Sequence, residues 1–341
     1  MNIYMYPISD PKKSVSKNPY MDKLIESIES NNCRVVNKEQ ISRFGVFDLL
    51  LYMGKVDTYY LNWIENLPDR RFGGIQAVLF LLIFLVLKLF GKKIVWMMHN
   101  KLSHSKKGLF LKIITNYFLI NYSNIVLTHS LDGVRFANIL LRNEKMIEFI
   151  HHPLENSTKK INDDLERNID ILIWGSISPY KGIDTFLEYL QKSEVSSKYS
   201  IHIVGKITNN ELEQKLNQYV SDKIVIENDF ISTQKLEELF TRSRMVLFTY
   251  TGYSTLSSGA LMDTLVYNSY VIGPNVGAFR DLHEEGLIDT FIDFNNLIEK
   301  LEDGLFNKNL DSQKLTNFIE ENTWGNFGSW LCKIMNKSIK S

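Results

Sequence analysis

The sequence has few cysteines and no excess of charge of either sign. Of its 341 residues only Cys33 and Cys332 are cysteines, and they stand far apart in the chain. Such usage argues against a disulfide framework or a cysteine zinc site, and it fits a reducing cytoplasm. Basic and acidic residues both number 39, so the formal net charge is zero. No basic field therefore indicates a nucleic-acid partner.

Several sequence signals are also missing. There is no short-period repeat and no low-complexity tract. The first ten residues, MNIYMYPISD, lack the basic and apolar regions of a signal peptide, so we expect a first strand there. No His-Glu-x-x-His motif occurs, and His99, His129 and His151 have no supporting carboxylate spacing, so we expect no metal site. Hydrophobic residues make up 44%, enough for packed cores.

One apolar run stands out, IQAVLFLLIFLVLKLFGKK at residues 75–93. A bilayer span needs about 20 apolar residues, and this run is shorter. Two interpretations stay open. The run is either a buried helix of an α/β domain, or an interfacial helix whose flanking Arg70, Arg71, Lys92 and Lys93 face anionic headgroups. Both hold if one face of the helix packs inward and the other meets lipid.

Short apolar runs alternate with amphipathic stretches along both halves of the chain, which predicts α/β domains with parallel, doubly wound sheets. A polar stretch at 154–168 indicates a linker. We therefore expect domains at 1–155 and 156–318, followed by a C-terminal helix at 319–341. Two such domains would face each other across a cleft, and ligands bind beyond the carboxyl ends of the strands.

The turn WGSISPYKG, residues 174–182, follows the apolar run IDILI and precedes a helical pattern. A helix start offers free N–H groups and a positive dipole end, which suit an anion such as phosphate. The glycine spacing excludes a P-loop. The alternative is an ordinary strand-to-helix turn with an exposed lysine. The candidate anion-binding residues here are Gly175, Ser176, Ser178 and Lys181.

A second turn, SSGALMD at residues 257–263, also opens a helix after a strand. Ser257, Ser258 and Gly259 can bind a pyrophosphate through hydroxyl and N–H groups. Asp263, about one turn into the helix, can accept hydrogen bonds from a ribose. The alternative is a serine N-cap with an aspartate in the first turn.

Two further strand ends in the second half are candidate donor contacts. Gly205 ends a strand, and Phe230 and Ile231 can present backbone groups to a base edge. The segment GPNVGAFRDL, residues 273–282, predicts another glycine-rich loop. The segment FDLLLYM in the first half predicts a strand or a short buried element.

In the first half, His99 directly follows the strand pattern KKIVWMM. A histidine at the carboxyl end of a strand can act as base, acid or partner of a sugar hydroxyl, although a lone histidine is more often structural. Other polar or aromatic residues also follow predicted strands in this half. They are Asn18, Tyr20, Asn100, His104 and His129.

Three segments together resemble a known family. WGSISPYKGIDTFLEYL, SSGALMDTLVYNSYVIGPNVGAF and KIVWMMHN are similar to segments of GT-B glycosyltransferases of the broad family-four, or group 1, type. The resemblance implies two Rossmann-like domains and transfer of a sugar from a UDP- or GDP-type donor to a hydroxyl, without a metal or other cofactor. The C-terminal domain would hold the donor, and the N-terminal domain, joined by the last helix, the acceptor.

By position, Lys181 would neutralise the diphosphate leaving group and His99 would contact the transferred sugar. The 257–259 turn would bind phosphate oxygens, and Asp263 the ribose. The sequence departs from the family pattern in the turn before Lys181. Many relatives have an arginine there, and Ser176 and Ser178 occupy the candidate places in this sequence. It departs again near Thr255, where many relatives have a glutamate, so a retaining or inverting course stays open.

The resemblance also implies a bacterial hexosyltransferase that extends a polyprenyl-linked saccharide for capsule, O-antigen or exopolysaccharide. Such an enzyme would be peripheral on the cytoplasmic face of the plasma membrane, with residues 75–93 docking there. Two alternatives keep the fold. One is a sugar-nucleotide epimerase, and the other is a non-catalytic partner subunit of another transferase.

Overall fold

The structure is a computed structural model. It describes residues 1–8, 19–40, 44–102, 107–143, 145–156, 166–193, 195, 198–252, 254–302 and 311–340. The chain divides into two compact units. Unit 1 comprises Met1–Pro153, Ser254–Ser257 and Asn322–Ser341, and unit 2 comprises Leu154–Tyr253 and Ser258–Glu321.

Unit 1 is built on a six-stranded sheet in the order β2-β1-β3-β4-β5-β6, with each of these pairs parallel. Because β1 lies between β2 and β3, the direction in which the sheet grows reverses there, and the β1/β3 pair is the topological switch point. The strands are β1 Asn2–Tyr6, β2 Arg34–Val35, β3 Thr58–Asn62, β4 Lys93–Met98, β5 Ile125–Thr128 and β6 Ile147–Phe149.

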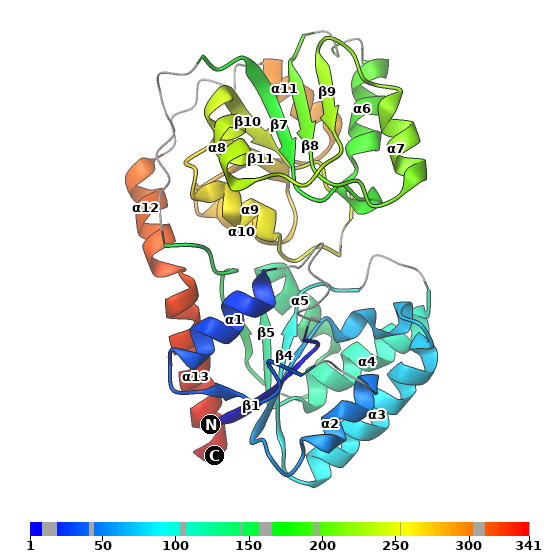
Figure 1. Ribbon diagram of the computed structural model, residues 1–341, viewed down its shortest axis with the longest axis vertical. Helices are drawn as coiled ribbons and strands as arrows, with labels where there is room; N and C mark the ends of the chain where they lie inside the picture. The colour runs from blue at the N-terminus through cyan, green and yellow to red at the C-terminus, as the bar shows by residue number, and fades with distance from the viewer. Residues whose placement is uncertain are drawn as a thin grey trace. The chain divides into compact units, whose positions relative to one another are not determined.

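Alternate residues of these strands feed two separate cores. Tyr59 and Leu61 face a core shared with Phe80 and Phe84 of α3, whereas Tyr60 faces a core with Leu331 of α13. Figure 1 shows α1 and α13 on one side of this sheet and α3 and α4 on the other. The helices of unit 1 are α1 Tyr20–Glu29, α2 Asp48–Leu51, α3 Gly73–Leu89, α4 Leu109–Tyr122, α5 Leu131–Leu140 and α13 Trp324–Lys340, with short 3₁₀ turns η2 Gly45–Phe47 and η3 Ile64–Asp69.

Unit 2 has a second six-stranded sheet, in the order β12-β11-β10-β7-β8-β9, again with parallel pairs. Growth reverses between β7 and β10, so the switch point of this unit lies there. The strands are β7 Ile169–Trp174, β8 Ile201–Val204, β9 Ile224–Glu227, β10 Ser243–Leu247, β11 Val271–Pro274 and β12 Asp289–Phe291.

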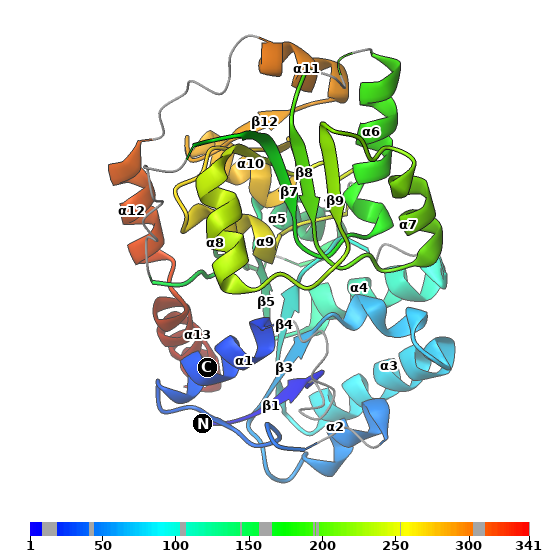
Figure 2. The same ribbon diagram turned by 45° about the horizontal axis from the view of Figure 1, so that its top comes forward.

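The sheet of unit 2 also alternates between two cores. Leu172 of β7 packs with the residues of α8, α9 and α10, whereas Ile171 and Ile173 pack with those of α6, α7 and α11. Figure 2 shows α6 and α7 side by side next to β8 and β9. The helices are α6 Ile183–Lys192, α7 Asn210–Asn217, α8 Thr233–Arg242, α9 Gly259–Leu265, α10 Gly277–Glu284, α11 Phe294–Glu302 and α12 Ser312–Glu321, with η4 Pro179–Lys181 before α6.

Polar side chains cap the N-termini of several helices. Ser232 caps α8 as predicted, since its Oγ accepts a hydrogen bond from the Lys235 backbone N–H. Asn209 caps α7 and Ser130 caps α5 in the same way. The α/β class and the two doubly wound sheets predicted from the alternation of strands and helices are confirmed.

Of the two alternatives predicted for FDLLLYM, residues 47–53, the short buried element is confirmed and the strand is not. The segment forms the end of η2 and then α2, with Leu49 fully buried. One local prediction was wrong. The expected glycine-rich loop at 273–282 contains α10, whose Phe279 ring packs so closely on Gly273 that a Cβ there would lie 2.3 Å from Phe279 Cδ1. A helix is present at the predicted C-terminal position, α13 Trp324–Lys340, and α12 precedes it. Thr323 Oγ1 accepts a hydrogen bond from the Asn326 N–H at the start of α13.

Candidate active site

At the switch point of unit 2, the segment after β7 and the segment after β10 are tied together. The Thr251 N–H donates to the Tyr180 carbonyl oxygen at 3.2 Å, which joins the two backbones. The 3₁₀ turn η4 places Lys181 at this point, at the carboxyl end of both strands. Parallel sheets of this kind bind ligands beyond the strands at the switch point, so this edge of the sheet is the candidate ligand-binding site of unit 2.

The side chain of Lys181 is buried, with 6% of its surface exposed, and its Nζ lies 5.2 Å from the centre of the Tyr250 ring. Burial lowers the pKa of Lys181 below its usual value. No carboxylate forms an ion pair with it within the described part of the chain. A buried ammonium that has no anion is costly. The site is therefore complementary to an anionic ligand.

Tyr250 connects Lys181 to the second predicted turn. The Tyr250 hydroxyl and Ser258 Oγ share a hydrogen bond of 2.9 Å, and burial raises the pKa of Tyr250 to about 12. Ser258 Oγ also accepts from the Leu261 N–H, so this hydroxyl caps α9. The two predicted turns thus meet through Tyr250. Tyr250 was not among the predicted site residues, although it follows the end of β10.

The segments after β7 and β8 approach each other at two glycines. Gly175 has φ 97° and Gly205 has φ 151°, both disfavoured for residues with a side chain. A Cβ on Gly205 would lie 1.9 Å from the Gly175 carbonyl oxygen, and one on Gly175 would lie 3.3 Å from Lys181 Nζ. The two glycines therefore allow backbone to pack beside the ammonium.

The other predicted donor residues are less closely gathered. Ser176 is exposed, and Ser178 is half-buried directly before η4. Phe230 is exposed and Ile231 half-buried, both just before α8. Gly259 and Asp263 lie on α9, whereas Ser257 belongs to the segment grouped with unit 1.

In unit 1 an aromatic cluster surrounds Tyr20, the first residue of α1. Trp63 follows β3, so Tyr20 and Trp63, with ring centroids 5.7 Å apart, stand at the β1/β3 switch point. Among the described residues, these rings lie within 6 Å of the Tyr20 ring by centroid: Trp63, His99, His129, His152 and Trp324. Trp63 and Trp324 keep part of their surface exposed. Neither tryptophan was predicted, because no motif marks them.

Hydrogen bonds set the tautomer of His129. Its Nδ1 lies 3.0 Å from the Ile150 carbonyl oxygen, which only accepts, so Nδ1 carries the hydrogen. Burial lowers the pKa of His129 well below its usual value, so the ring is neutral. Its Nε2 therefore accepts from the Tyr20 hydroxyl at 3.0 Å. The Tyr20 and His129 side chains predicted for the acceptor side are brought together.

His99 is held in the opposite tautomer. Its Nε2 lies 2.9 Å from Asn62 Oδ1, an acceptor, so Nε2 carries the hydrogen and Nδ1 keeps its lone pair. The imidazole stacks on Trp63 with ring centroids 4.5 Å apart and planes 16° apart. Burial, and then the neighbouring His152, lower the pKa of His99 to about 3. Nδ1 of His99 is thus a neutral hydrogen-bond acceptor.

Asn100 is held in unit 1 by contacts of its backbone and its side chain. It forms an antiparallel bridge with Thr255, and its Nδ2 lies 3.4 Å from Oε1 of the buried Glu65. Burial raises the pKa of Glu65 to about 7. The neighbouring Leu256 is fully buried in the core that contains Phe80. The predicted residues Asn18 and His104 lie outside the described residues.

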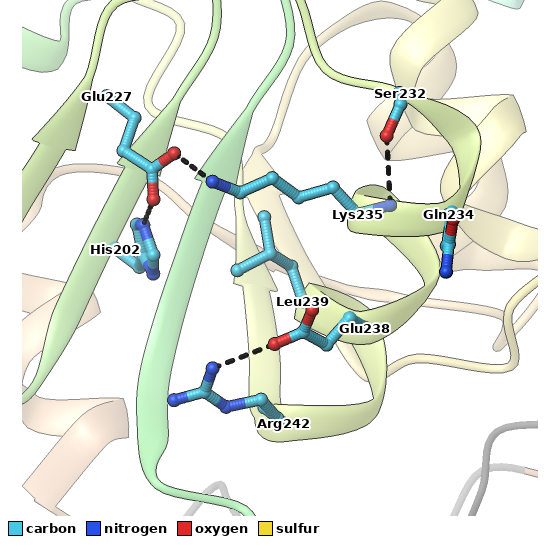
Figure 3. A pocket seen from close by; sticks show the side chains of 8 residues that line it. All are labelled: His202, Glu227, Ser232, Gln234, Lys235, Glu238, Leu239 and Arg242. Atoms are coloured by element: carbon cyan, nitrogen blue, oxygen red, sulfur yellow. Dashed lines mark hydrogen bonds and ion pairs between the residues drawn. The ribbon is translucent and has the colours of Figure 1, made fainter.

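A cavity lies away from Lys181 in unit 2. It has a volume of about 320 Å³ between β8, β9 and α8. Figure 3 shows that its charged side chains pair with one another: Glu227 accepts from His202 and Lys235, and Arg242 pairs with Glu238. Since these charges are already compensated, the cavity shows no unmet demand for a charged ligand. Across the residues described, no group of three or more His, Cys, Asp or Glu side chains is placed to hold a metal ion.

Comparison with protein-family models and with curated proteins finds no match. Solved structures do match over nearly the whole chain. The Anabaena protein HepE in complex with UDP is 12% identical, with a TM-score of 0.70 over 99% of this chain and 100% of that one. A structure of HepE in complex with UDP-glucose is 13% identical, with a TM-score of 0.66 over 100% of this chain and 98% of that one. Sucrose-phosphate synthase from Thermosynechococcus elongatus is 12% identical, with a TM-score of 0.72 over 98% of each chain. The likeness shows the predicted GT-B fold.

Proposed function

We propose that the protein is a glycosyltransferase that moves a hexose from a nucleotide-diphosphate sugar, of the UDP or GDP type, to a hydroxyl of a saccharide acceptor. The observation that carries the proposal is the buried ammonium of Lys181 at the switch point of unit 2, which has no ion-pair partner among the described residues. HepE, which shares the fold, has been solved with UDP and with UDP-glucose. A diphosphate supplies the anion that this ammonium lacks.

Lys181 has a chemical role in this proposal. When the bond between sugar and phosphate breaks, negative charge builds on the leaving diphosphate, and a fixed positive charge beside it lowers the barrier. The ammonium is buried beside the Tyr250 ring, where its field is weakly screened. The lysine supplies positive charge at this point, so the proposed reaction requires no metal.

The remaining predicted donor residues complete the donor side. Gly175 and Gly205 let backbone approach the diphosphate, and Asp263 holds the ribose. The Tyr250–Ser258 pair fixes the start of α9 beside Lys181. Ser176 and Ser178 lie on the β7 segment, where they contact phosphate oxygens.

Unit 1 supplies the acceptor side of the proposal. The partly exposed faces of Trp63 and Trp324 suit the apolar face of a sugar ring, because aromatic rings bind such faces by stacking. The neutral Nδ1 of His99 accepts a hydrogen bond from a sugar hydroxyl. The hydrogen bond between the Tyr20 hydroxyl and His129 Nε2 fixes both side chains and so holds the cluster in place.

We further propose a polyprenyl-diphosphate-linked saccharide as the acceptor, in bacterial capsule, O-antigen or exopolysaccharide synthesis. The enzyme would work on the cytoplasmic face of the plasma membrane and contact the bilayer through residues 75–93. Support comes from the apolar composition of α3 and its basic flanks. No helix of the described residues is long and apolar enough to cross a membrane.

The test is incubation of the full chain with a panel of UDP- and GDP-sugars, with and without a lipid-linked acceptor mimic. Nucleotide release and product mass are measured. Release that requires the acceptor supports transfer. A donor isomerised without acceptor identifies the epimerase, and binding without turnover identifies the partner subunit; either result rejects the proposal.

A further inference from the structure

One stripe along α3 is both apolar and exposed. Ile75, Val78, Leu82, Leu85 and Leu89 recur at the three- and four-residue spacing of one helix face. Their exposed fractions include 63% for Ile75, 55% for Leu82 and 86% for Leu89. Soluble proteins expose single apolar side chains, but a continuous stripe marks an interaction surface.

The fold does not require this stripe. The opposite face of α3 carries Ala77, Phe80, Phe84 and Leu87, which are buried in the core of unit 1. That face alone anchors the helix to the sheet. Packing inside unit 1 therefore explains the apolar residues on one face of α3 and leaves the exposed stripe unexplained.

Helix α4 extends the same surface. Leu109, Phe110 and Ile113 in its first turns are exposed, Phe110 by 73%. The two helices touch near their starts, since a Cβ on Gly74 of α3 would lie 3.7 Å from Leu111 Cδ1 of α4. Figures 1 and 2 both show α3 and α4 side by side. We call the exposed apolar residues of the two helices the α3–α4 face.

The two helices and their flanks carry charges of one sign, whereas Asp69, which ends η3, pairs with Lys112 of α4. Residues 70–93 and 107–122 contain lysines and arginines but no aspartate or glutamate. Arg71 is exposed beside the Phe72 ring, with its Cζ 5.1 Å from the ring centre, and Lys107 is exposed just before α4. Lys92 is half-buried and donates to the Val56 carbonyl oxygen, so part of this charge is already engaged.

We propose that the α3–α4 face inserts into the interfacial region of a bilayer that contains anionic lipid, with α3 lying in the plane of the membrane. This inference rests on the membrane contact in the proposed function and names the surface that makes it. The apolar stripe favours the boundary between headgroups and acyl chains, and the cationic rim favours anionic headgroups. Since few of the rim charges are fully exposed, apolar insertion supplies most of the affinity, and added salt weakens binding only modestly.

The experiment is co-sedimentation of the full chain with vesicles of phosphatidylcholine and phosphatidylglycerol. The variants are Leu82→Ser with Leu85→Ser on α3, and Phe110→Ser with Ile113→Ser on α4. The matched control is Ile139→Ser, a residue of α5 that is exposed by 81% and lies outside the face. Each double variant is expected to weaken vesicle binding by about tenfold or more, and the control to leave it unchanged.

Two readouts separate this inference from the proposed function. Transfer to a water-soluble acceptor mimic is expected to be equal in wild type and variants. If wild type transfers sugar but does not bind vesicles, or if the variants bind as well as wild type, the α3–α4 face is not a membrane surface. Sedimentation velocity tests whether a second copy of the chain covers the face instead. If the wild type is a dimer that binds no vesicles, and the variants are monomers, the face is a dimer interface and the inference is overturned.

Discussion

Thr249 holds the backbone of Lys181. Its Oγ1 donates a hydrogen bond of 2.7 Å to the Lys181 carbonyl oxygen, and the Thr249 side chain is buried. The lysine is therefore fixed by its main chain through the segment after β10, independently of its own side chain. Replacing that side chain should leave the turn in place, which makes its charge testable without loss of the fold.

Replacing Lys181 by methionine should lower activity and raise stability at once. Lys181→Met removes a buried charge that lacks a countercharge among the described residues, and methionine is an unbranched side chain of similar length. We therefore expect the free energy of unfolding to rise by about 1 kcal/mol. We expect kcat/KM for the donor sugar to fall by about 100-fold or more, because the leaving diphosphate loses its countercharge. Denaturant titration and initial rates measure the two effects. A destabilised variant with full activity would show that the lysine is structural.

Truncating Trp63 should affect the acceptor and spare the donor. Trp63 stacks on His99 and keeps part of its surface exposed. For Trp63→Ala we expect the acceptor KM to rise about tenfold with the donor KM unchanged, because one aromatic contact is lost. Trp330→Ala is the control, since Trp330 lies on the same side of the sheet but packs its ring near Phe327. Equal effects of both changes would contradict an acceptor role for Trp63.

The pH dependence of activity should show no contribution from His99 near neutrality. Burial lowers the pKa of His99 to about 3, so the ring stays neutral throughout the usual assay range. We expect His99→Asn to lower kcat/KM by a similar factor at every pH between about 5 and 8. Rate profiles of wild type and variant test this. An acid limb near pH 6.5 that disappears in the variant would mean that His99 titrates as an exposed base.

Glu65 should lower stability as the pH rises. Burial raises its pKa from 4.5 to about 7, so between these values the folded state binds a proton that the unfolded state has lost. Stability therefore falls across this window, and the loss is complete above about pH 7. Glu65→Gln should raise the free energy of unfolding by about 3 kcal/mol near pH 8 and change it little near pH 4. Denaturant titrations at both pH values decide; a gain of the same size at both would rule out ionisation as the cause.

Gly205 should tolerate no side chain. A Cβ there would lie 1.9 Å from the Gly175 carbonyl oxygen, and the φ of 151° is strained for alanine. For Gly205→Ala we expect destabilisation by about 1–3 kcal/mol and weaker nucleotide binding. Gly54→Ala is the control, because a Cβ on Gly54 would meet no atom within 4 Å and its φ is ordinary. Thermal unfolding and calorimetric titration with UDP compare the two variants.

Much of the fold follows from the local pattern of the sequence. Strands such as β4 and β7 are short apolar runs that end at polar or glycine residues, and their parallel order follows from the helices between them. The prediction for segment 273–282 was wrong because its glycines are typical of a loop. The packing of Phe279 on Gly273, which a single sequence does not display, makes this segment a strand end and a helix.

The candidate site was predictable where a residue follows a strand or stands in a turn that opens a helix. His99 and His129 directly follow β4 and β5, and Lys181 lies in the turn between β7 and α6. Tyr250 and Trp63 also follow strands, but their roles depend on contacts with residues remote in the chain, Ser258 and Tyr20. For α3, the sequence left a buried and an interfacial helix open, because an all-round apolar helix has no periodicity that separates its faces. The structure shows which residues are covered.

The division of unit 1 among three chain segments limits how the protein can be taken apart. Phe327 and Leu331 of the C-terminal helix are buried against Leu24 and Ile28, and Leu256 fills the opposite core. A fragment ending at Pro153 would expose both places to water, so it should aggregate rather than fold. Recombination that exchanges unit 2 between related proteins must preserve every crossover, including the four-residue segment at 254–257.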